Sequence, residues 1–485
     1  MSAADTQIRS ASRRIVIDPV TRVEGHGKVT IRLNEDGVVE QARFHIVEFR
    51  GFERFIRGRL FWEAGVVVER LCGICPVSHH LAAAKAMDMI VGADKLTPTA
   101  EKVRRLMHYG QVLQSNALNI FHLASPDLLF GFDAPPEERN IAAVLSRYPE
   151  IGKWAIYIRK FGQEVIKAVS GRKIHPTNAI PGGVNKNLSI EHRDTLRKDI
   201  DQIREWCCEA LERHKGYVHA HEQLHRDFAS FPSNYLSLVG EGGRMDLYDG
   251  RLRALDQNGA PIFDGVSPIQ YRDYLIEEVR PWSYMKFPHI KSLGKADGWY
   301  RVGPLAQLNC CSSIDTPVAE AARKEFMQQG GGKPVHSTLA YHWARLICMV
   351  HCAEKIRELL FDDDLQGTDL RVSGTRCSEG IACIEAPRGT LFHHYTVDGN
   401  DQITSANLIV STTHNNEAMN RAVKEVADQY LSGREITEGL LNHIEVAIRA
   451  FDPCLSCATH ALGDMPLRVT LEDAAGQTIA TGTKG

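Results

Sequence analysis

Two Cys-x-x-Cys pairs, one toward each end of the 485-residue chain, constrain its folding more than any other feature. The first pair is Cys72 and Cys75, and the second, about 380 residues further on, is Cys454 and Cys457. A spacing of two residues lets both sulfurs of a pair turn toward one metal, and four thiolates form a soft site for zinc, an iron–sulfur cluster or another thiophilic metal. If all four bind one centre, the fold must bring the two pairs together.

The spacing alone leaves three interpretations of these pairs open. One is a functional metal centre. Another is a structural zinc site, although zinc ribbons usually keep their pairs about 15 to 20 residues apart and a chain with a large core has little need of such a staple. The third is a set of unrelated thiols. A thioredoxin-like redox pair is a less suitable alternative, because it needs a βαβ setting that neither pair has.

Composition and charge exclude several classes of protein. Hydrophobic residues make up 43% of the chain and charged residues 24%, which is ordinary for a globular protein with a large core. The net charge is −3 and there is no basic run, so no nucleic-acid partner is expected. No apolar stretch reaches the roughly 18 residues of a membrane helix, and the apolar segment after Arg13-Arg14 is too short for a signal peptide. We therefore expect a cytoplasmic protein without a membrane span.

The remaining eight of the twelve cysteines carry no clear pattern. Disulfides are not expected in a cytoplasmic chain, and we expect these thiols to be small buried hydrophobes. Cys348 and Cys352 have the four-residue spacing of one helix face and could pair on a metal, but no second pair of ligands lies nearby.

The pattern of apolar residues predicts an α+β fold that is mainly α. Strands are expected over residues 14–18, 28–33 and 38–47, with a turn at 34–37. Thr97-Pro98 has the form of a helix start, and Ser189 is expected to open one long helix that continues past Leu211. Residues 339–360 are apolar on most sides and predict a central buried helix. Two further helices are expected at 416–430 and 435–450, and an irregular excursion with short strands at 235–300.

These elements predict one large helical core with a β-rich N-terminal portion. We find no internal repeat and no clear linker, so one large domain is expected, and the last 25 residues, 461–485, differ in pattern from the rest.

The sequence around each cysteine pair resembles a signature of nickel–iron hydrogenase large subunits. The first runs Arg-Leu-Cys-Gly-Ile-Cys over residues 70–75 with His79 after it, and the second runs Asp-Pro-Cys-Leu-Ser-Cys over 452–457 with His460 after it. Arg-Val-Glu-Gly-His at 22–26 and Glu-Ala-Pro-Arg-Gly at 385–389 resemble two further family motifs. The general run of sequence is most similar to the NAD-reducing, bidirectional cytoplasmic group.

The resemblance implies a nickel–iron centre that catalyses the reversible oxidation of H₂ to protons and electrons. Cys72 and Cys454 would be terminal nickel ligands, Cys75 and Cys457 would bridge nickel and iron, and the iron would carry carbon monoxide and two cyanides. Heterolysis of H₂ needs a Lewis acid and a base. The metals would supply the first, and a cysteine thiolate or Arg388 the second.

The resemblance also implies roles for residues around the centre. Glu24 would take the proton from a terminal cysteine, with a salt bridge to Arg22 as the structural alternative. Arg388, Asp127 and Asp452 would form a charged canopy over the open metal position, although Asp452 also suits a helix N-cap. His79 would hydrogen-bond a bridging sulfur. Two pairs of residues complete the set: Pro387 and Thr412 would line the cyanide pocket, and Glu53 and His460 would bind Mg²⁺.

Several features of electron-transfer proteins are missing from the sequence. No Gly-x-Gly-x-x-Gly opens a helix, and no further cysteine cluster could hold an iron–sulfur centre. Electrons must then leave through partners. The family implies an Fe–S small subunit, together with a diaphorase module that carries Fe–S clusters, FMN and the NAD site. Two rival hypotheses remain: a structural subunit related to the quinone-site subunit of respiratory complex I, whose group has lost the metal cysteines, and a zinc-stabilised scaffold.

The resemblance implies that residues 1–460 form a single catalytic domain and that the last 25 residues, 461–485, are a C-terminal extension removed on maturation. Large subunits of this kind are made as precursors, which a dedicated protease cuts after the histidine of the second signature, here between His460 and Ala461, and the metal is loaded by nickel-insertion chaperones. The alternating residues 467–471 and the turn at 475–477 predict a hairpin. A strand beyond His460 would hold the second cysteine pair away from the first. In a chain that carries this segment, the two pairs are therefore expected to stand apart or to hold no metal.

Overall fold

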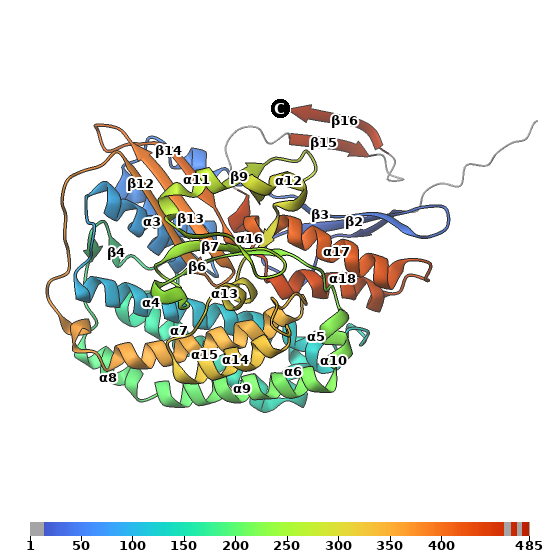
Figure 1. Ribbon diagram of the computed structural model, residues 1–485, viewed down its shortest axis with the longest axis horizontal. Coiled ribbons are helices and arrows are strands. Elements are labelled where there is room, and N and C mark those ends of the chain that lie inside the picture. The colour runs from blue at the N-terminus through green and yellow to red at the C-terminus, as the bar shows by residue number, and fades with distance from the viewer. Residues whose placement is uncertain (1–13, 460–466, 473–477, 485) are drawn as a thin grey trace, which may run out of the picture.

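The computed structural model describes residues 14–459, 467–472 and 478–484. Long helices lie alongside one another in one half of the molecule, and small sheets lie against them in the other half (Figure 1). The expected fold class, mainly α with several small sheets, is confirmed. Among the described residues, no helix is both long and apolar enough to cross a lipid bilayer. The helices of eleven residues or more are α3 (Pro76–Ile90), α4 (Pro98–Leu118), α7 (Pro149–Ser170), α9 (Ile200–Ala220), α14 (Pro317–Gln328), α15 (Ala340–Leu360), α17 (Asn416–Leu431) and α18 (Glu438–Phe451).

Shorter helices connect these long ones. They are α1 (Phe52–Phe55), α2 (Phe61–Val67), α5 (Ser125–Phe130), α6 (Ile141–Arg147), α8 (Ile190–Arg197), α10 (Glu222–Asp227), α11 (Tyr271–Tyr274), α12 (Gly294–Asp297), α13 (Pro304–Cys310) and α16 (Ser411–His414).

The helical core is built around α15. This helix packs against α4 on one side and against α9 on another, and most of its residues are buried. The prediction of a central buried helix at 339–360 is therefore confirmed. The side chain of Thr97 accepts a hydrogen bond from the backbone of Ala100 and so caps α4, as its sequence predicts.

The helix expected to run on from Ser189 is wrong in its length. Ser189 does cap a helix, but α8 ends at Arg197 and α9 begins at Ile200. The backbone N–H groups of Lys198 and Asp199 bond to carbonyls three residues earlier, at 3.3 and 3.2 Å. This tighter turn interrupts the α-helical ladder and separates the two helices.

The N-terminal strands form an antiparallel sheet in the order β1 (Arg14–Ile17), β2 (Gly27–Leu33) and β3 (Val39–Ile46). Helix α17 packs on β3, so this sheet is joined to the core near the second cysteine pair.

The expected excursion at 235–300 contains short strands, as predicted: β6 (Asn234–Val239), β7 (Arg251–Leu255), β8 (Pro261–Val266), β9 (Leu275–Glu278), β10 (Phe287–Ile290) and β11 (Tyr300–Arg301). A further two-strand pair is β4 (Ala179–Ile180) with β5 (Gly183–Val184).

A three-stranded sheet between residues 379 and 409 was not predicted from the sequence. It has the order β12 (Glu379–Ala386), β13 (Gly389–Val397) and β14 (Ile403–Ile409), and α3 packs on β12. Nearly every residue of β12 and β13 is buried on both faces, so the strands lack the alternation of apolar and polar residues that marks a half-exposed strand.

The C-terminal segment contains the predicted hairpin. Strand β15 (Leu467–Glu472) pairs antiparallel with β16 (Thr478–Lys484), and the two form a sheet of their own (Figure 1). The residues proposed for its turn, 475–477, lie outside the described residues.

Candidate metal centre

The four cysteines converge into one buried cluster. The sulfur of Cys72 lies 3.1 Å from that of Cys454, and the sulfur of Cys75 lies 3.7 Å from that of Cys457. All four sulfurs lie within 4.8 Å of one another, and all four side chains are buried. Within the described part of the chain, they are the one group of metal-ligand type that meets so closely.

Secondary structure positions each cysteine of the first pair. Cys72 follows the 3₁₀ turn Val68–Leu71, and Cys75 is the N-cap residue of α3, with Pro76 at the first helical position. The backbone N–H of Ile74 points at the Cys72 sulfur at 3.1 Å. A helix N-terminus and a backbone N–H both favour negative charge, so this segment suits thiolates.

The second pair is held by contacts with the N-terminal segment. Glu24 and Cys454 form a parallel β-bridge, and the backbone N–H of Leu455 donates to the carbonyl of Glu24 at 3.0 Å. The backbone N–H of Cys454 also donates to Thr412 Oγ1 at 2.9 Å. These bonds come from residues before position 460, and they place the second pair beside the first.

The expectation that the C-terminal segment holds the cysteine pairs apart is therefore wrong. The cluster is closed in a chain that also contains β15 and β16. The physical reason is that Glu24 and Thr412 fix the second pair from upstream, so its position does not depend on where the chain ends.

Gly25 explains how the Glu24 segment can approach so closely. Its φ is +82°, a conformation that glycine adopts without strain. A Cβ atom at this position would lie 2.8 Å from both Leu455 Cβ and the backbone nitrogen of Ser456. The glycine of the 22–26 motif is thus required by the approach of two backbones.

The carboxylate of Glu24 lies directly on the cluster. The thiol of Cys454 donates to Glu24 Oε2 at 3.0 Å, and Ser456 binds the same carboxylate through its backbone N–H at 3.2 Å and through its hydroxyl. Arg22, the alternative partner, binds Asp127 instead. Glu24 is only half-buried, so it connects the buried sulfur with a more exposed region.

Arg388 is held above the cluster by a hairpin. Ala386 pairs with Gly389 in the β12–β13 ladder, so Pro387 and Arg388 form the two-residue turn. The guanidinium donates to the backbone and carboxylate of Asp452, at 2.6 and 3.1 Å. Burial opposes its charge, but Asp452 and the cysteines raise the pKa of Arg388 well above its ordinary value, so it remains a cation.

Asp452 and Asp127 have different environments. Asp452 follows α18 in a left-handed conformation at the end of the helix, so the alternative reading as an N-cap is wrong. Burial raises its pKa, while Arg388 and Arg345 act in the opposite direction. Asp127 binds Arg22 and Arg449, whereas Arg388 Nη1 donates to the hydroxyl of Ser115 at 3.2 Å.

His79 begins a short line of polar side chains that leads away from Cys75. Hydrogen bonds with the thiols of Cys454, Cys457 and Cys72 lower the pKa of Cys75 well below its ordinary value. A hydrogen bond with His79 adds a smaller contribution in the same direction. His79 Nδ1 lies 3.1 Å from His393 Nε2, and His393 Nδ1 lies 2.6 Å from the hydroxyl of Tyr395. By contrast, burial raises the pKa of Cys454 and of Cys457.

Glu53 is buried, and one of its oxygens accepts a hydrogen bond from the backbone of Leu408 at 2.8 Å. Its negative charge adds to burial in raising the pKa of Tyr395, so it lies near the outer end of the His79 line. The other expected Mg²⁺ ligand, His460, lies outside the described residues.

A small cavity adjoins the cluster. Cys75, Pro387, Arg388, Thr412 and Cys454 are among its lining residues, and its volume is about 10 Å³, roughly that of one water molecule. The residues proposed for the cyanide pocket, Pro387 and Thr412, thus line one space beside two of the sulfurs.

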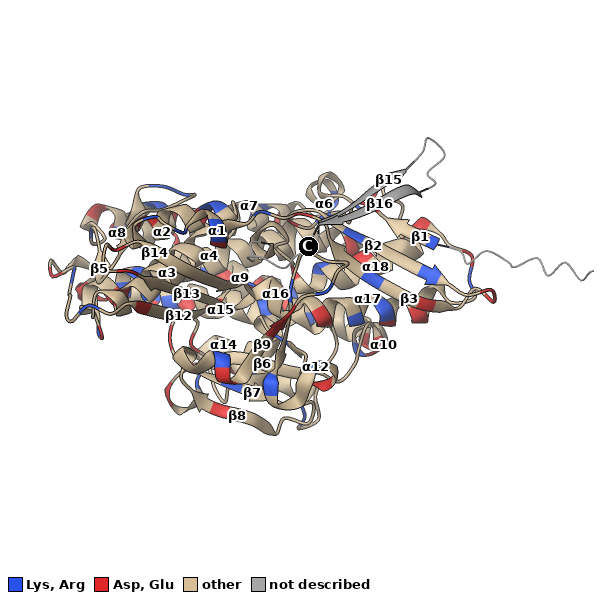
Figure 2. Cartoon of the chain, turned by 90° about the horizontal axis from the view of Figure 1, so that it is seen from above, with Lys and Arg blue, Asp and Glu red and all other residues tan. Residues whose placement is uncertain are grey.

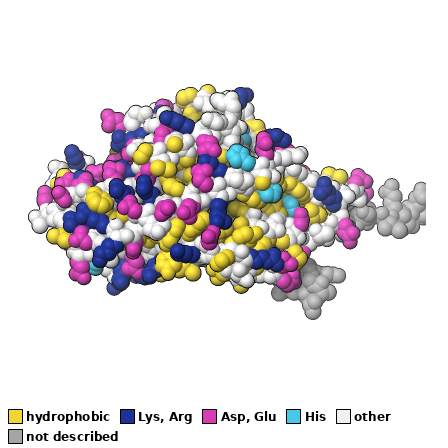
Figure 3. Space-filling model, turned by 90° about the horizontal axis from the view of Figure 1, so that it is seen from below, with side chains coloured by type: hydrophobic (Ala, Val, Ile, Leu, Met, Phe, Trp, Pro, Cys, Tyr) yellow, Lys and Arg dark blue, Asp and Glu magenta, His cyan; other side chains and the backbone are white. Residues whose placement is uncertain are grey.

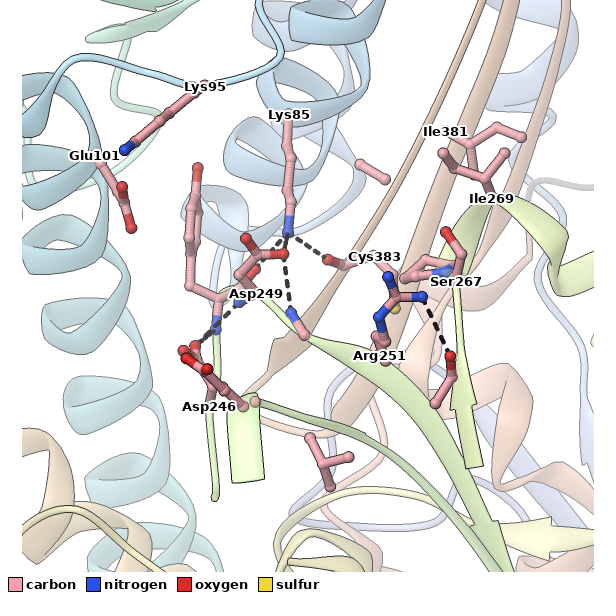
Figure 4. Close-up of a pocket in the computed structure, with 18 of the residues that line it drawn as sticks. Lys85, Lys95, Glu101, Asp246, Asp249, Arg251, Ser267, Ile269, Ile381 and Cys383 are labelled. Atoms are coloured by element: carbon pink, nitrogen blue, oxygen red, sulfur yellow. Dashed lines mark hydrogen bonds and ion pairs between the residues drawn. The ribbon is translucent and has the colours of Figure 1, made fainter. Parts of the chain in front are cut away.

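A larger cavity of about 1140 Å³ lies elsewhere and contains none of the predicted site residues. Within it, Lys85 binds Asp249 at 2.9 Å and the backbone carbonyl of Cys383 at 3.2 Å (Figure 4). In the view of Figure 2, acidic and basic residues are interspersed along the chain.

Sequence reasoning missed Ser115, Ser456, His393 and Tyr395. Ser456 lies inside the second cysteine motif, so its place beside Glu24 could have been considered. Ser115, His393 and Tyr395 come from segments without a chemical motif, and only the packing of α4 and the 379–409 sheet brings them to the centre.

Comparisons with known proteins agree with this site. The model of the nickel-dependent hydrogenase family matches residues 50–130 and 237–460, and a HoxL-like model matches residues 14–49. The chain is 48% identical to the NAD-reducing hydrogenase HoxS subunit beta of Cupriavidus necator, over 96% of this chain and 99% of the relative. It is 30% identical to the sulfhydrogenase 2 alpha chain of Pyrococcus furiosus, over 92% of this chain and 98% of the relative.

Solved structures show the same relationship. A crystal structure of an NAD⁺-reducing [NiFe]-hydrogenase in the H₂-reduced state has 57% sequence identity and a TM-score of 0.91, covering 93% of this chain and all of the other. The Ni-Fe-Se hydrogenase of D. vulgaris Hildenborough, 22% identical with a TM-score of 0.75, covers 93% of this chain and all of the other, and shares the fold. This chain therefore belongs to the family of nickel-dependent hydrogenase large subunits, enzymes that act on H₂.

Proposed function

We propose that the chain is the catalytic subunit of an NAD-reducing hydrogenase, and that it oxidises H₂ reversibly at a nickel–iron centre held by Cys72, Cys75, Cys454 and Cys457. The observation that carries this proposal is the convergence of four buried thiols with a carboxylate on one sulfur and a buried guanidinium beside them. Soft thiolates suit nickel and iron, and their protons leave when the metals bind.

The residues around the cluster fit such a centre. When bound, it supplies the Lewis acid and redox chemistry that splitting H₂ requires. In this proposal all four cysteines would hold the metals, Cys72 and Cys454 as terminal ligands and Cys75 and Cys457 as the shared ones. Carbon monoxide and two cyanides on the iron would face Pro387 and Thr412, which line the cavity beside the sulfurs.

Glu24 is the proposed proton acceptor. It already accepts a hydrogen bond from the Cys454 thiol, so a proton can pass from that sulfur to its carboxylate without a large movement. Its partial exposure lets the proton continue toward solvent.

Arg388 and its partners hold a fixed positive charge beside the site. The hairpin turn, Asp452 and Ser115 orient the guanidinium, so it can stabilise negative charge without reorganising. Asp127 would act at a distance, by orienting Arg22 and Arg449 next to the Glu24 segment.

The proposed Mg²⁺ site consists of Glu53 and His460. The support is the burial of the Glu53 carboxylate near Tyr395, at the end of the line that begins with His79 at the cluster. A buried carboxylate is usually paired or coordinates a metal.

Electrons would leave through partner subunits. We propose an Fe–S small subunit, and with it a diaphorase module with Fe–S clusters and FMN, which passes the electrons to NAD⁺, and a cytoplasmic location for the complex. The printed name of the relative from Cupriavidus necator supports the acceptor. Large exposed side chains such as Phe49, Phe55 and Trp62, just before the first cysteine pair, suit contacts with a partner. Figure 3 shows patches of hydrophobic side chains between the charged ones on one face.

We also propose that a maturation protease removes residues 461–485 after nickel-insertion chaperones have acted. Two observations support this. The family match ends at residue 460, and the hairpin β15–β16 pairs with no other strand among the described residues. The segment thus behaves as an appendage to the catalytic domain.

The test is an assay of the native complex under H₂. With an artificial one-electron dye as acceptor, the large subunit with its Fe–S partner should suffice for H₂-dependent reduction, whereas NAD⁺ reduction should need the flavin module as well. Dye reduction without any NAD⁺ reduction by the full complex would contradict the proposed acceptor. Absence of all H₂-dependent reduction would contradict the proposed function and favour a structural subunit or a zinc-stabilised scaffold.

A further inference from the structure

Three buried histidines on three helices lie one after another between the metal centre and solvent. His342 on α15 has its ring centroid 6.4 Å from that of His214 on α9, and His214 lies 5.8 Å from His225 on α10. Their exposed fractions are 1%, 8% and 6%. We call them the histidine row.

The inner end of the row reaches the residues around the cysteines. Nη1 of Arg345 lies 3.5 Å from His342 Nδ1, and Nη2 donates to the carbonyl of Ala450 at 3.1 Å. Asp452 attracts Arg345 electrostatically and is also the partner of Arg388. The row therefore begins at Arg345, and Arg345 interacts electrostatically with the Asp452–Arg388 pair beside the cluster.

The outer end of the row reaches the surface. The ring of Tyr217 lies 5.2 Å from that of His225 and 4.4 Å from that of His221. His221 is exposed, and its Nδ1 lies 3.0 Å from the carbonyl of Tyr217. A series of polar side chains thus runs from Arg345, which is under the electrostatic influence of Asp452 and Arg388, to the surface at His221.

Buried atoms along this series have no partner within the described part of the protein. They are Nε2 of His214, Nε2 of His225, Nε of Arg345, both side-chain polar atoms of Asn116 and Oδ1 of Asn119. Asn116 belongs to the same helix as Tyr109, whose ring packs against His351 of α15, so α4 faces α15 along this length. Buried polar atoms are nearly always bonded to protein or to ordered water, and these atoms have no bond to protein.

The histidines can relay protons without becoming charged. Burial lowers the pKa of His214 to about 3 and that of His225 to about 4, and burial together with Arg345 holds the pKa of His342 well below its ordinary value. At neutral pH each ring therefore has one nitrogen that donates and one that accepts. No hydrogen bond joins these rings directly within the described part of the chain, and ring centroids 5.8 and 6.4 Å apart suit bridging water molecules.

We propose that the histidine row, together with Arg345, Asn116 and Asn119, encloses a chain of ordered water molecules that forms a second proton route between the metal centre and solvent at His221, in addition to Glu24. In each step a water that carries the excess proton gives it to one ring nitrogen, while the proton on the other nitrogen leaves to the next water, which then carries the excess proton. The ring stays neutral, and a reorientation of the ring restores the original tautomer. Arg388 and Asp452 keep their charges and only anchor the inner water. This inference rests on the proposed function for its physiological meaning.

The first test is a high-resolution crystal structure of the mature native complex. Ordered water molecules should lie within hydrogen-bond distance of His214 Nε2, His225 Nε2 and Arg345 Nε. A row without water at these three atoms would overturn the proposal whatever the activity of the enzyme.

The second test is the exchange of D₂ with solvent protons, measured without an electron acceptor. Glu24→Gln should retain a small residual exchange, and His214→Phe in that background should lower it at least about tenfold, because a phenyl ring fills the space and cannot relay. His225→Phe should act in the same way if His214→Phe fails to load nickel. His219→Phe, on the same helix but exposed, is the matched control and should leave the residual exchange unchanged.

Nickel content is measured for every variant, so that loss of the metal is distinguished from loss of the route. The proposal is overturned if Glu24→Gln has no residual exchange, or if nickel-loaded His214→Phe and His225→Phe leave it unchanged. A wild-type complex that loads nickel but shows no exchange at all would instead contradict the proposed function.

Discussion

The carboxylate of Glu24 accepts a hydrogen bond from the thiol of Cys454 at 3.0 Å, although 430 residues separate the two in the chain. The same glutamate binds Ser456 through both of its carboxylate oxygens. The segment that contains the second cysteine pair therefore fixes the orientation of the Glu24 side chain. This contact joins the N-terminal motif to the second cysteine pair and places a proton acceptor on a prospective metal ligand.

Glu24→Gln keeps the shape and hydrogen bonding of this side chain but cannot carry a proton away. H₂ oxidation should fall by roughly 10²–10⁴-fold, the usual contribution of a general base, while nickel content stays normal. Glu48→Gln, which removes a carboxylate from an exposed pair with His26, is the control and should remain active. Near-normal H₂ oxidation by Glu24→Gln would assign Glu24 a structural role only.

Gly25→Ala tests whether the close approach of the two backbones is required. Alanine at positive φ costs about 1 kcal/mol wherever it occurs, but at Gly25 its Cβ would also collide with Leu455 and Ser456. Gly37→Ala shares the positive φ, at +76°, and would meet nothing within 4 Å. We expect Gly25→Ala to lose most of its nickel and Gly37→Ala to keep it. Equal nickel contents in the two variants would contradict a requirement for the close approach at Gly25.

The buried carboxyl group of Glu385 should make the free energy of unfolding depend on pH. Burial raises its pKa to about 7 from an ordinary value of 4.5, against hydrogen bonds from Gln307, Leu238 and Thr390. Between these two values the folded state binds more protons than the unfolded state, so the free energy of unfolding falls as pH rises from 4.5 to 7 and levels off above that. The whole change is about 3 kcal/mol at most, since one pKa unit corresponds to about 1.4 kcal/mol.

Glu385→Gln removes this titration, so its thermal midpoint relative to the wild type should rise as pH increases from 4.5 to 7. The exposed Glu40→Gln serves as the control and should follow the wild-type profile. A constant difference between Glu385→Gln and the wild type across this range would mean that Glu385 does not titrate there.

Much of the fold follows from sequence pattern, but the parts that complete the site do not. The N-terminal strands, the cap at Thr97 and the buried helix α15 follow from local periodicity and capping. The 379–409 sheet that holds Arg388 does not, because strands buried on both faces have no alternating pattern.

The candidate site was predicted where a motif carries chemistry and missed where packing alone decides. The four cysteines and Glu24 lie in motifs whose residue types require a metal or a proton acceptor. Ser115 contacts Arg388 only because α4 passes the hairpin turn, and a lone serine in a helix carries no such signal.

Intact mass spectrometry of the large subunit tests the proposed maturation. The active, nickel-loaded subunit should end at His460, and the nickel-free chain should retain residues 461–485. Because Glu24 and Thr412 hold the second cysteine pair from upstream, a chain truncated after His460 should still fold, and its unfolding midpoint can be compared with that of the full chain. An active, nickel-loaded subunit that still carries residues 461–485 would refute the cleavage.

The cysteines themselves provide the sharpest variants. Cys75→Ser and Cys457→Ser should abolish activity and stable nickel binding, because a neutral hydroxyl cannot bridge two soft metals. Cys377→Ser changes an exposed thiol outside the cluster and should do neither.

Nickel X-ray absorption of the purified native complex, with its nickel content, tests the central claim most directly. The account predicts nickel bound by sulfur ligands in the wild type and in Cys377→Ser, and its loss from Cys75→Ser and Cys457→Ser. Zinc in place of nickel, or nickel that persists with the same sulfur ligands in either bridging variant, would contradict the assignment of Cys72, Cys75, Cys454 and Cys457 as the ligands of the catalytic centre.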